Sequence, residues 1–275
     1  MHSVLFEIGP LPIHWYGVMM ATGFLAGLTS WVLLGRTCNR DAQFCSDLMF
    51  WVMLSGVFGA RIAYVVENWS LYADSPLAIL KLNQGGLIFY GGLIAAGAVI
   101  VFYARQRGER ALPLVDFSLT AVPLAHAFGR IGCFLHGCCF GKCTDLPLGV
   151  RFPQGTGAWI SHHSADLIGE MAPLSKAVHP VQLYEAAYNL IIYGVLVLIF
   201  RRSTRAGTVS AAYMMLYSLG RFALEFFRGD RGVRLEIGSL SVGQAVSIPI
   251  FLLGVVLLLS VRFLKRSPTP QSDGQ

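Results

Sequence analysis

The chain has 275 residues, of which 55% are hydrophobic and 13% are charged, and its mean hydropathy is +0.59. Soluble globular domains carry about 25% charged residues, so this composition excludes that class and predicts an integral membrane protein. The net charge of +6 is explained by basic loop residues of a membrane protein and does not indicate nucleic-acid binding.

Seven apolar stretches are each long enough to cross the hydrocarbon layer, which takes roughly 20 helical residues. They cover residues 14–35, 46–66, 86–104, 114–134, 182–200, 207–227 and 241–261. Nothing basic but the N-terminus itself precedes the first stretch, and further spans follow, so we expect it to be retained and not cleaved as a signal peptide. The predicted fold is an all-α integral membrane protein, with residues 1–275 forming a single transmembrane domain of seven helices.

Basic residues in the loops predict the orientation of these helices. Three of the 21 Lys and Arg residues lie within spans. One side of the membrane receives eleven of the others: Arg36, Arg40, Arg105, Arg107, Arg110, Arg201, Arg202, Arg205, Arg262, Lys265 and Arg266. The opposite side receives seven basic residues against eight acids, or nine if Glu185 is counted at the surface. The first side is therefore cytoplasmic, which places the N-terminus outside and the C-terminus inside.

Two segments lie outside the predicted spans. Residues 135–181 are too polar to cross the membrane and form a non-cytoplasmic insertion between the fourth and fifth spans. Its apolar patches, Val150–Phe152 and Trp159–Ile160, indicate either short strands or a small cap over a membrane site. Residues 267–275 form a short polar tail on the cytoplasmic side.

Six polar side chains fall inside the spans at one depth, toward the outer leaflet. They are Arg61, Tyr90, Arg130, Glu185, Arg221 and Glu225. A charge at the centre of a membrane helix costs at least about 2.5 to 3.5 kcal/mol, so such residues indicate function. We therefore expect several of them to share one site near the non-cytoplasmic surface.

The charges in this set favour an anionic ligand. Arg221 and Glu225 are four residues apart on one helix face and can pair with each other, which alone would be an ordinary structural contact. However, three arginines face only two carboxylates. A lipid phosphate matches the planar guanidinium fork and supplies the missing negative charge.

Glycines cluster around these polar groups. Gly91 and Gly92 follow Tyr90, and Gly141 is one of several glycines that surround Arg130 in the sequence. Small residues in membrane helices often serve only close packing. Beside Tyr90, the double glycine more specifically favours approach of the backbone to a lipid head group.

Four cysteines fall at the outer end of the fourth span, and they allow three interpretations. They are Cys133, Cys138, Cys139 and Cys143. A disulfide from Cys133 or Cys138 to Cys143 would stiffen the outer loop. Redox or nucleophilic chemistry would use a thiolate favoured by nearby Arg130 and Lys142. A metal site would add His136 to three thiolates, but the spacing differs from the usual paired knuckles, so no metal or cofactor is expected.

Motifs in order along the chain show a resemblance to a known family. They are Ile13-His14-Trp15-Tyr16-Gly17, Gly59-Ala60-Arg61, Gly91-Gly92-Leu93, Gly129-Arg130-Ile131-Gly132-Cys133-Phe134, His179-Pro180-Val181-Gln182-Leu183-Tyr184-Glu185 and Gly220-Arg221-Phe222 with Glu225-Phe226-Phe227-Arg228. From Gly9 to about residue 262 the chain resembles prolipoprotein diacylglyceryl transferase, and more closely a divergent, cysteine-containing branch of that family.

The resemblance implies an enzyme of the bacterial inner membrane. Such an enzyme transfers diacylglycerol from phosphatidylglycerol to the cysteine thiol of a lipoprotein precursor, recognised with its signal peptide, and releases glycerol phosphate. It implies lipid-binding roles for Arg130 and Arg221, a substrate contact at Tyr16, and action as a monomer. Three positions depart from the family pattern: Tyr90 replaces a histidine, Cys133 an asparagine and Cys138 a glutamate.

For the reaction itself, we expect Arg130 and Arg221 to stabilise the leaving phosphate, with Arg61 among the substrate contacts. Tyr90 orients the substrate through its hydroxyl, and Glu185 or Glu225 accepts the thiol proton.

Two other functions remain open from the sequence. A membrane thiol-disulfide oxidoreductase would use the four outer cysteines, although it would not need the arginines. A catalytically altered paralogue would bind the lipid without turning it over, since three motif positions are substituted.

Overall fold

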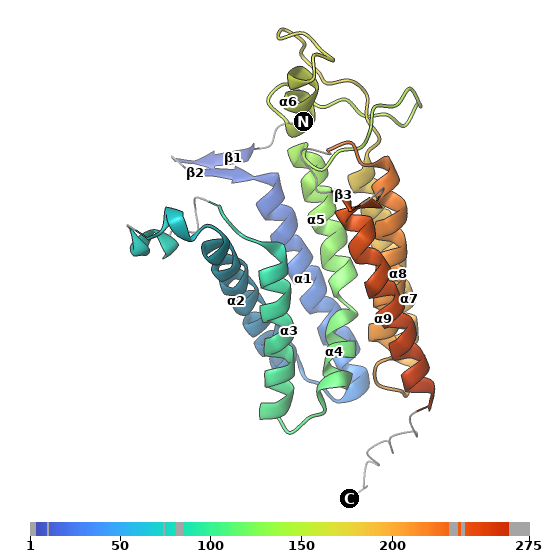
Figure 1. Ribbon diagram of the computed structural model, residues 1–275. Coiled ribbons are helices and arrows are strands. Elements are labelled where there is room, and N and C mark those ends of the chain that lie inside the picture. The colour runs from blue at the N-terminus through green and yellow to red at the C-terminus, as the bar shows by residue number, and fades with distance from the viewer. Residues whose placement is uncertain are drawn as a thin grey trace, which may run out of the picture. The chain divides into compact units, whose positions relative to one another are not determined.

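The computed structural model describes residues 4–9, 11–73, 75–80, 85–230, 236–237 and 240–263 (Figure 1). The predicted cytoplasmic tail, residues 267–275, lies outside these ranges. Among the described residues the structure is almost wholly helical. It has α1 (Trp15–Gly35), α2 (Ala42–Glu67), α3 (Phe89–Gln106), α4 (Ala111–Leu119), α5 (Val122–His136), α6 (Gly157–Ser164), α7 (Val181–Arg202), α8 (Thr208–Leu224) and α9 (Val242–Phe263).

Short elements connect these helices. The residues that the structure describes include two antiparallel strand pairs, β1 (Val4–Ile8) with β2 (Leu11–His14) and β3 (Glu236–Ile237) with β4 (Leu240–Ser241). Single 3-10 turns occur at η1 (Arg36–Cys38), η2 (Trp69–Leu71), η3 (Pro76–Leu80) and η5 (Glu225–Phe227).

Within the described part of the chain, six helical segments are long and apolar enough to cross a membrane, counting α4 and α5 together and α1 with its 3-10 extension. The chain is therefore an integral membrane protein, as its composition predicts. The seventh predicted span, residues 207–227, corresponds to α8, which has 17 residues and continues into η5.

Local sequence explains where several helices begin and end. The Asp41 carboxylate accepts a hydrogen bond of 2.7 Å from the Phe44 amide and caps the start of α2. The predicted fourth span is broken between α4 and α5 near Thr120, because Pro123 has no amide hydrogen to continue the helical ladder. Gly137 ends α5 in the left-handed conformation, with a φ of 78°, which glycine adopts without strain.

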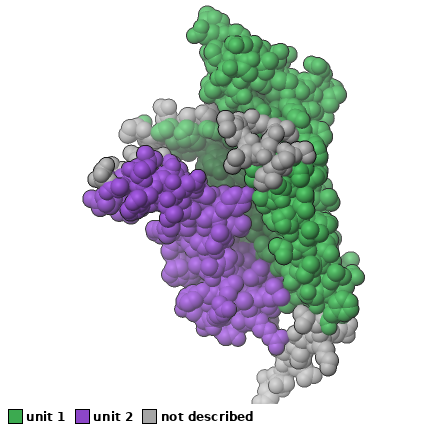
Figure 2. All heavy atoms as spheres, in the orientation of Figure 1, with its two compact units in different colours: residues 1–27, 119–275 green, residues 28–118 purple. Residues whose placement is uncertain are grey.

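The chain forms two compact units, residues 1–27 with 119–275 and residues 28–118 (Figure 2). In the first unit α7 packs against α5 and α8, and α8 packs against α9 (Figure 1). Ile192, Leu196 and Val209 form a buried cluster between α7 and α8. A Cβ atom at Gly220 would overlap the Tyr188 ring, so close packing of α8 against α7 requires glycine there.

The 137–180 segment of this unit folds around its own apolar cluster. Phe140, Phe152, Ala158 and Val178 are buried together, and Phe134 at the end of α5 packs against them. The predicted apolar patches behave differently from each other. Val150 forms a β-bridge with Val178, whereas the Trp159–Ile160 patch lies in α6, where the Thr156 hydroxyl caps the helix start. The prediction of a strand at Trp159–Ile160 is therefore wrong.

In the second unit α2 packs closely on α3. A Cβ atom at Gly91 would lie 2.5 Å from the Gly59 carbonyl oxygen, and one at Gly92 would lie 2.8 Å from that of Gly56. The double glycine therefore serves helix packing. Its predicted contact with a lipid head group stays a prediction.

Candidate active site

Arg130, His126 and Glu185 form a polar contact between α5 and α7. Arg130 Nη2 lies 2.9 Å from Glu185 Oε1, and Arg130 Nε donates a hydrogen bond of 3.1 Å to His126 Nε2. Because His126 Nε2 accepts this bond, that nitrogen is unprotonated and the ring is neutral. The side chains of Arg130 and Glu185 are only 16% and 4% exposed, so the pair is largely shielded from solvent.

A second ion-pair network lies at the end of α8. Arg221 Nη1 is 2.7 Å from Glu225 Oε2, and Arg228 Nε is 3.9 Å from the same oxygen. Arg228 also pairs with Asp230 through two hydrogen bonds of 3.0 and 2.6 Å. Glu225 is fully buried and Arg228 is 5% exposed. The i,i+4 pair expected from the sequence is present, and the network extends beyond it.

The two networks are close enough to interact. Arg130 and Arg221 both act electrostatically on His126, although they project from α5 and from α8. Arg228 likewise acts on Glu185. His126 also packs against Tyr217 of α8, with ring centroids 5.7 Å apart. Four of the six predicted residues, Arg130, Glu185, Arg221 and Glu225, thus lie in two buried ion-pair networks of the first unit that interact electrostatically.

Arg228 was missed as a site residue by the sequence reasoning. The signal that could have found it is its spacing, three residues after Glu225 and two before Asp230. Proximity in the sequence to two carboxylates predicts a paired arginine even at the edge of an apolar stretch.

Three of the four outer cysteines gather next to Arg130. The Sγ atoms of Cys133, Cys138 and Cys139 all lie within 4.8 Å of one another. Hydrogen bonds from Cys133 and Cys138, together with the guanidinium groups of Arg130 and Arg228, hold the pKa of Cys139 below the ordinary thiol value. Cys139 adopts a left-handed φ of 57°, which is uncommon for a residue with a Cβ atom.

Cys143 lies outside this cluster. Its Sγ is 3.5 Å from His162 Nε2, and all six cysteines are free thiols in the structure. The predicted disulfide from Cys133 or Cys138 to Cys143 is therefore not formed. His136, the predicted fourth metal ligand, instead packs edge-on against His14 with ring centroids 6.5 Å apart.

Backbone contacts hold the cysteine loop in place. The Gln182 side chain donates a hydrogen bond of 2.7 Å to the Cys138 carbonyl. The Gly141 amide donates to the His179 carbonyl at 3.0 Å, and the Gly229 amide donates to the Phe140 carbonyl at 3.1 Å. A Cβ atom at Gly141 would lie 2.5 Å from the His179 oxygen. Gly141 thus has a packing role beside the site, and its predicted substrate contact stays untested.

Tyr16, at the start of α1, also lies beside this cluster. A Cβ atom at Gly132 would lie 3.2 Å from the Tyr16 ring, and Tyr16 interacts electrostatically with Cys133, Cys138 and Arg130. Its ring is 42% exposed, so it remains accessible to a substrate.

Arg61 and Tyr90 belong to the second unit. The Arg61 guanidinium donates to the carbonyls of Ile79, Gly85, Gly86 and Ala78 at 2.7 to 3.1 Å. It is 4% exposed, and these bonds engage all three of its guanidinium nitrogens. Arg61 therefore organises the loop before α3. Tyr90, in the first turn of α3, is 60% exposed.

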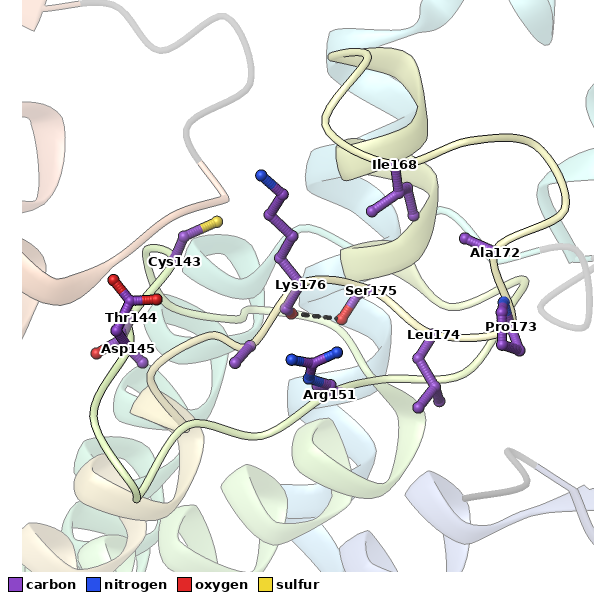
Figure 3. A pocket seen from close by; sticks show the side chains of 11 residues that line it. Cys143, Thr144, Asp145, Arg151, Ile168, Ala172, Pro173, Leu174, Ser175 and Lys176 are labelled. Atoms are coloured by element: carbon purple, nitrogen blue, oxygen red, sulfur yellow. Dashed lines mark hydrogen bonds between the residues drawn. The ribbon is translucent and has the colours of Figure 1, made fainter.

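A separate cavity of about 620 Å³ lies within the 137–180 segment (Figure 3). Cys143, Arg151 and Lys176 are among the residues that line it. Figure 3 shows Lys176 and Arg151 beside Ser175, whose hydroxyl donates to the Lys176 carbonyl at 2.8 Å. None of the predicted catalytic residues lines this cavity.

Comparison with known proteins identifies the family. The family model of prolipoprotein diacylglyceryl transferase matches residues 3–260. The chain belongs to this family. A prolipoprotein diacylglyceryl transferase of Synechococcus elongatus is 34% identical over 269 residues, which cover 96% of this chain and 88% of the relative.

Two further relatives support the assignment. The Clostridium tetani protein is 31% identical over 97% of this chain and 100% of its own length. The Stenotrophomonas maltophilia protein is 35% identical over 98% of this chain and 93% of its own length. All three carry the name phosphatidylglycerol–prolipoprotein diacylglyceryl transferase. The prolipoprotein diacylglyceryl transferase family match thus spans both compact units and both ion-pair networks.

Proposed function

We propose that the chain transfers the diacylglyceryl group of phosphatidylglycerol to the thiol of a cysteine in a lipoprotein precursor. The observation that carries this proposal is the pair of mostly buried arginines, Arg130 of α5 and Arg221 of α8, each held by a buried carboxylate and both acting electrostatically on His126. Family membership supplies the reaction, and the two ion-pair networks supply the groups that such a reaction requires.

The arginines bind and stabilise the phosphate. In the transfer, the acceptor sulfur forms a bond to a glycerol carbon of the lipid, and the bond from that carbon to the phosphate oxygen breaks. The bonding electrons go to the phosphate, which leaves as glycerol phosphate. Guanidinium groups held in a shielded site stabilise this growing negative charge without reorganising. Arg130 and Arg221 perform this role, since each is mostly buried.

The carboxylates position the arginines. Glu185 and Glu225 each lie within 2.9 Å of a guanidinium nitrogen. A nearby positive charge favours the ionised form of a carboxylate and weakens it as a base. Either carboxylate can receive the thiol proton only while its arginine is engaged with the lipid phosphate. For the second unit we keep the prediction that Tyr90 contacts the substrate through its hydroxyl and that Arg61 contributes through the loop that it holds.

The membrane arrangement follows from the same proposal. α8 with η5 forms a seventh span, the N-terminus lies outside, and the C-terminus lies inside the bacterial inner membrane. The 137–180 segment then forms a cap on the outer face, where secreted precursors arrive with their signal peptides. We also keep the prediction that the protein works as a monomer.

The test uses a bacterium whose own transferase is depleted. The full chain restores growth and lipid modification of a reporter lipoprotein, whereas the Arg130→Ala variant does not. In parallel, purified protein is given labelled phosphatidylglycerol and a peptide that contains the acceptor cysteine. Label reaches this peptide but not a peptide with serine at that position.

Other outcomes would contradict the proposal. Phosphatidylglycerol binding without transfer would indicate a lipid-binding paralogue. Disulfide exchange without transfer would indicate a thiol oxidoreductase. Near wild-type transfer by purified Arg130→Ala would refute the role of that arginine.

A further inference from the structure

The three thiols beside Arg130 have the geometry of a metal site. Zinc binds thiolate sulfur at about 2.3 Å, so sulfur atoms around a tetrahedral ion lie about 3.8 Å apart. The Sγ atoms of Cys133, Cys138 and Cys139 already lie within 4.8 Å of one another. The sulfur atoms would have to close by at most about 1 Å to reach that spacing.

The backbone is arranged to bring these thiols together. Gly137 reverses the chain after α5 with a φ of 78°, which returns Cys138 and Cys139 to the helix end that carries Cys133. Cys139 is held at a φ of 57°, a conformation that persists in a non-glycine residue only where its surroundings impose it. Gln182, which is fully buried, fixes the Cys138 carbonyl. The cluster is thus a product of the fold.

The number of ligands indicates an open coordination position. Structural zinc sites have four protein ligands, whereas catalytic sites have three and keep the fourth position for water or substrate. Among the described residues, the group of potential ligands contains only the three cysteines. His136 is exposed and turned toward His14. An ion held here would therefore have room for one more ligand.

We propose that Cys133, Cys138 and Cys139 hold a Zn²⁺ ion whose fourth position binds the thiolate of the acceptor cysteine. The metal site itself is inferred from this chain alone, whereas the binding of the acceptor thiolate rests on the proposed function. The ion deprotonates the acceptor thiol on binding, and the proton leaves to solvent. The zinc-bound sulfur then attacks the glycerol carbon, and zinc remains divalent throughout.

Charge and position support this assignment. Zn²⁺ with three thiolates carries a net charge of −1, which becomes −2 when the acceptor thiolate binds. The guanidinium groups of Arg130 and Arg228 lie close enough to Cys139 to offset this charge. Arg130 also belongs to the proposed phosphate site, so the same guanidinium would lie next to both the metal-bound sulfur and the departing phosphate. Because the ion activates the thiol, the arginine-paired carboxylates need not act as strong bases.

The metal site is tested first without any turnover. The full chain is purified in detergent with Zn²⁺, and metal content is measured by mass spectrometry. About one zinc per chain is expected, and the Cys133→Ser, Cys138→Ser and Cys139→Ser variants should each bind it at least tenfold more weakly. Cys143→Ser is the matched control, since it removes a thiol from the same loop outside the cluster and should keep the metal.

The open position is tested with Co²⁺ in place of zinc. Co²⁺ bound to thiolates in a tetrahedral site gives visible and near-ultraviolet absorption. A peptide with the acceptor cysteine should increase the sulfur-to-metal charge-transfer band by about one third, as a fourth thiolate joins three. The same peptide with serine should leave the band unchanged.

The outcomes separate the two proposals. Absence of bound metal, or equal binding by Cys139→Ser and the wild type, overturns the metal site even if transfer proceeds. If metal binds but the Co²⁺ charge-transfer band does not change when the cysteine peptide is added, the assignment of the fourth position to the acceptor thiolate is overturned. Metal and peptide thiol bound as expected, without lipid transfer, supports the site and contradicts the proposed function. Isolation of the chain with a Cys133–Cys139 disulfide that takes up no zinc after reduction also overturns the site.

Discussion

Arg130 and Glu185 meet across the α5–α7 interface at 2.9 Å, although 55 positions separate them in the sequence. The same guanidinium uses its Nε atom on His126 at 3.1 Å. Two nitrogens of one guanidinium group are thus held by residues of two different helices. Because the group is planar and rigid, these two contacts also set the direction of its remaining N–H groups. The proposed binding of a lipid phosphate by Arg130 depends on this orientation.

Replacing Arg130 by lysine should fail to preserve function. A lysine carries the charge but cannot contact His126 and Glu185 with two coplanar nitrogens. We expect kcat/KM for lipid transfer to fall by about 100-fold or more, the usual cost of losing one stabilising donor. Arg107→Lys is the control, because Arg107 is partly exposed and pairs with Asp47 at 3.6 Å. Equal activity of the two variants would contradict the fork argument.

Arg228 should be essential for stability. It is 5% exposed and bonded to Asp230, and its removal leaves a shielded network short of one positive charge. Arg228→Gln should lower the free energy of unfolding by about 3 kcal/mol, as for other broken buried ion pairs. Arg151→Gln serves as the comparison, since Arg151 is exposed in the 137–180 segment. Thermal unfolding in detergent measures both, and similar melting temperatures would disprove the prediction.

Gly220 and Gly194 should respond oppositely to alanine. A Cβ atom at Gly220 would collide with the Tyr188 ring, whereas one at Gly194 meets nothing within 4 Å. Gly220→Ala should destabilise the α7–α8 pair by about 1 to 3 kcal/mol through overpacking. Gly194→Ala should be neutral or slightly stabilising. The melting temperatures of the two variants test this prediction. An unchanged melting temperature for Gly220→Ala would contradict it, because α7 and α8 could then move apart at little cost.

The 137–180 segment should lose stability in mild acid through His162. Burial, together with Lys176, lowers the pKa of His162 below its ordinary value of 6.5. As the pH falls through the pKa of His162 in the unfolded segment, the unfolded state binds a proton that the folded state does not. The free energy of unfolding of the segment therefore decreases as the pH falls through this range. Hydrogen-exchange protection of the segment, corrected for intrinsic rates, should decrease between pH ~7.5 and ~5.5.

The His162→Gln variant isolates this effect. It should flatten the pH dependence of protection, while His163→Gln, which alters the adjacent ring stacked on Trp159 at 5.0 Å, should retain it. Equal pH dependence in the two variants would assign the effect to another group.

The sequence by itself determined the features that depend on local spacing and on the membrane. Long apolar stretches become helices, because only internally hydrogen-bonded segments are stable in lipid. The Arg221–Glu225 pair follows from one helical turn. The break in the fourth span near Pro123 is also local.

Only the tertiary structure decided which distant groups meet. Nothing in the spacing joins Arg130 to Glu185, commits Arg61 to backbone carbonyls, or adds Arg228 to the network. Likewise, the four outer cysteines are equivalent in the sequence. The left-handed turn at Cys139 and the packing of Gln182 separate three of them from Cys143. Contacts between helices and the backbone conformation of a single residue depend on the whole fold, because packing imposes them from outside the local segment.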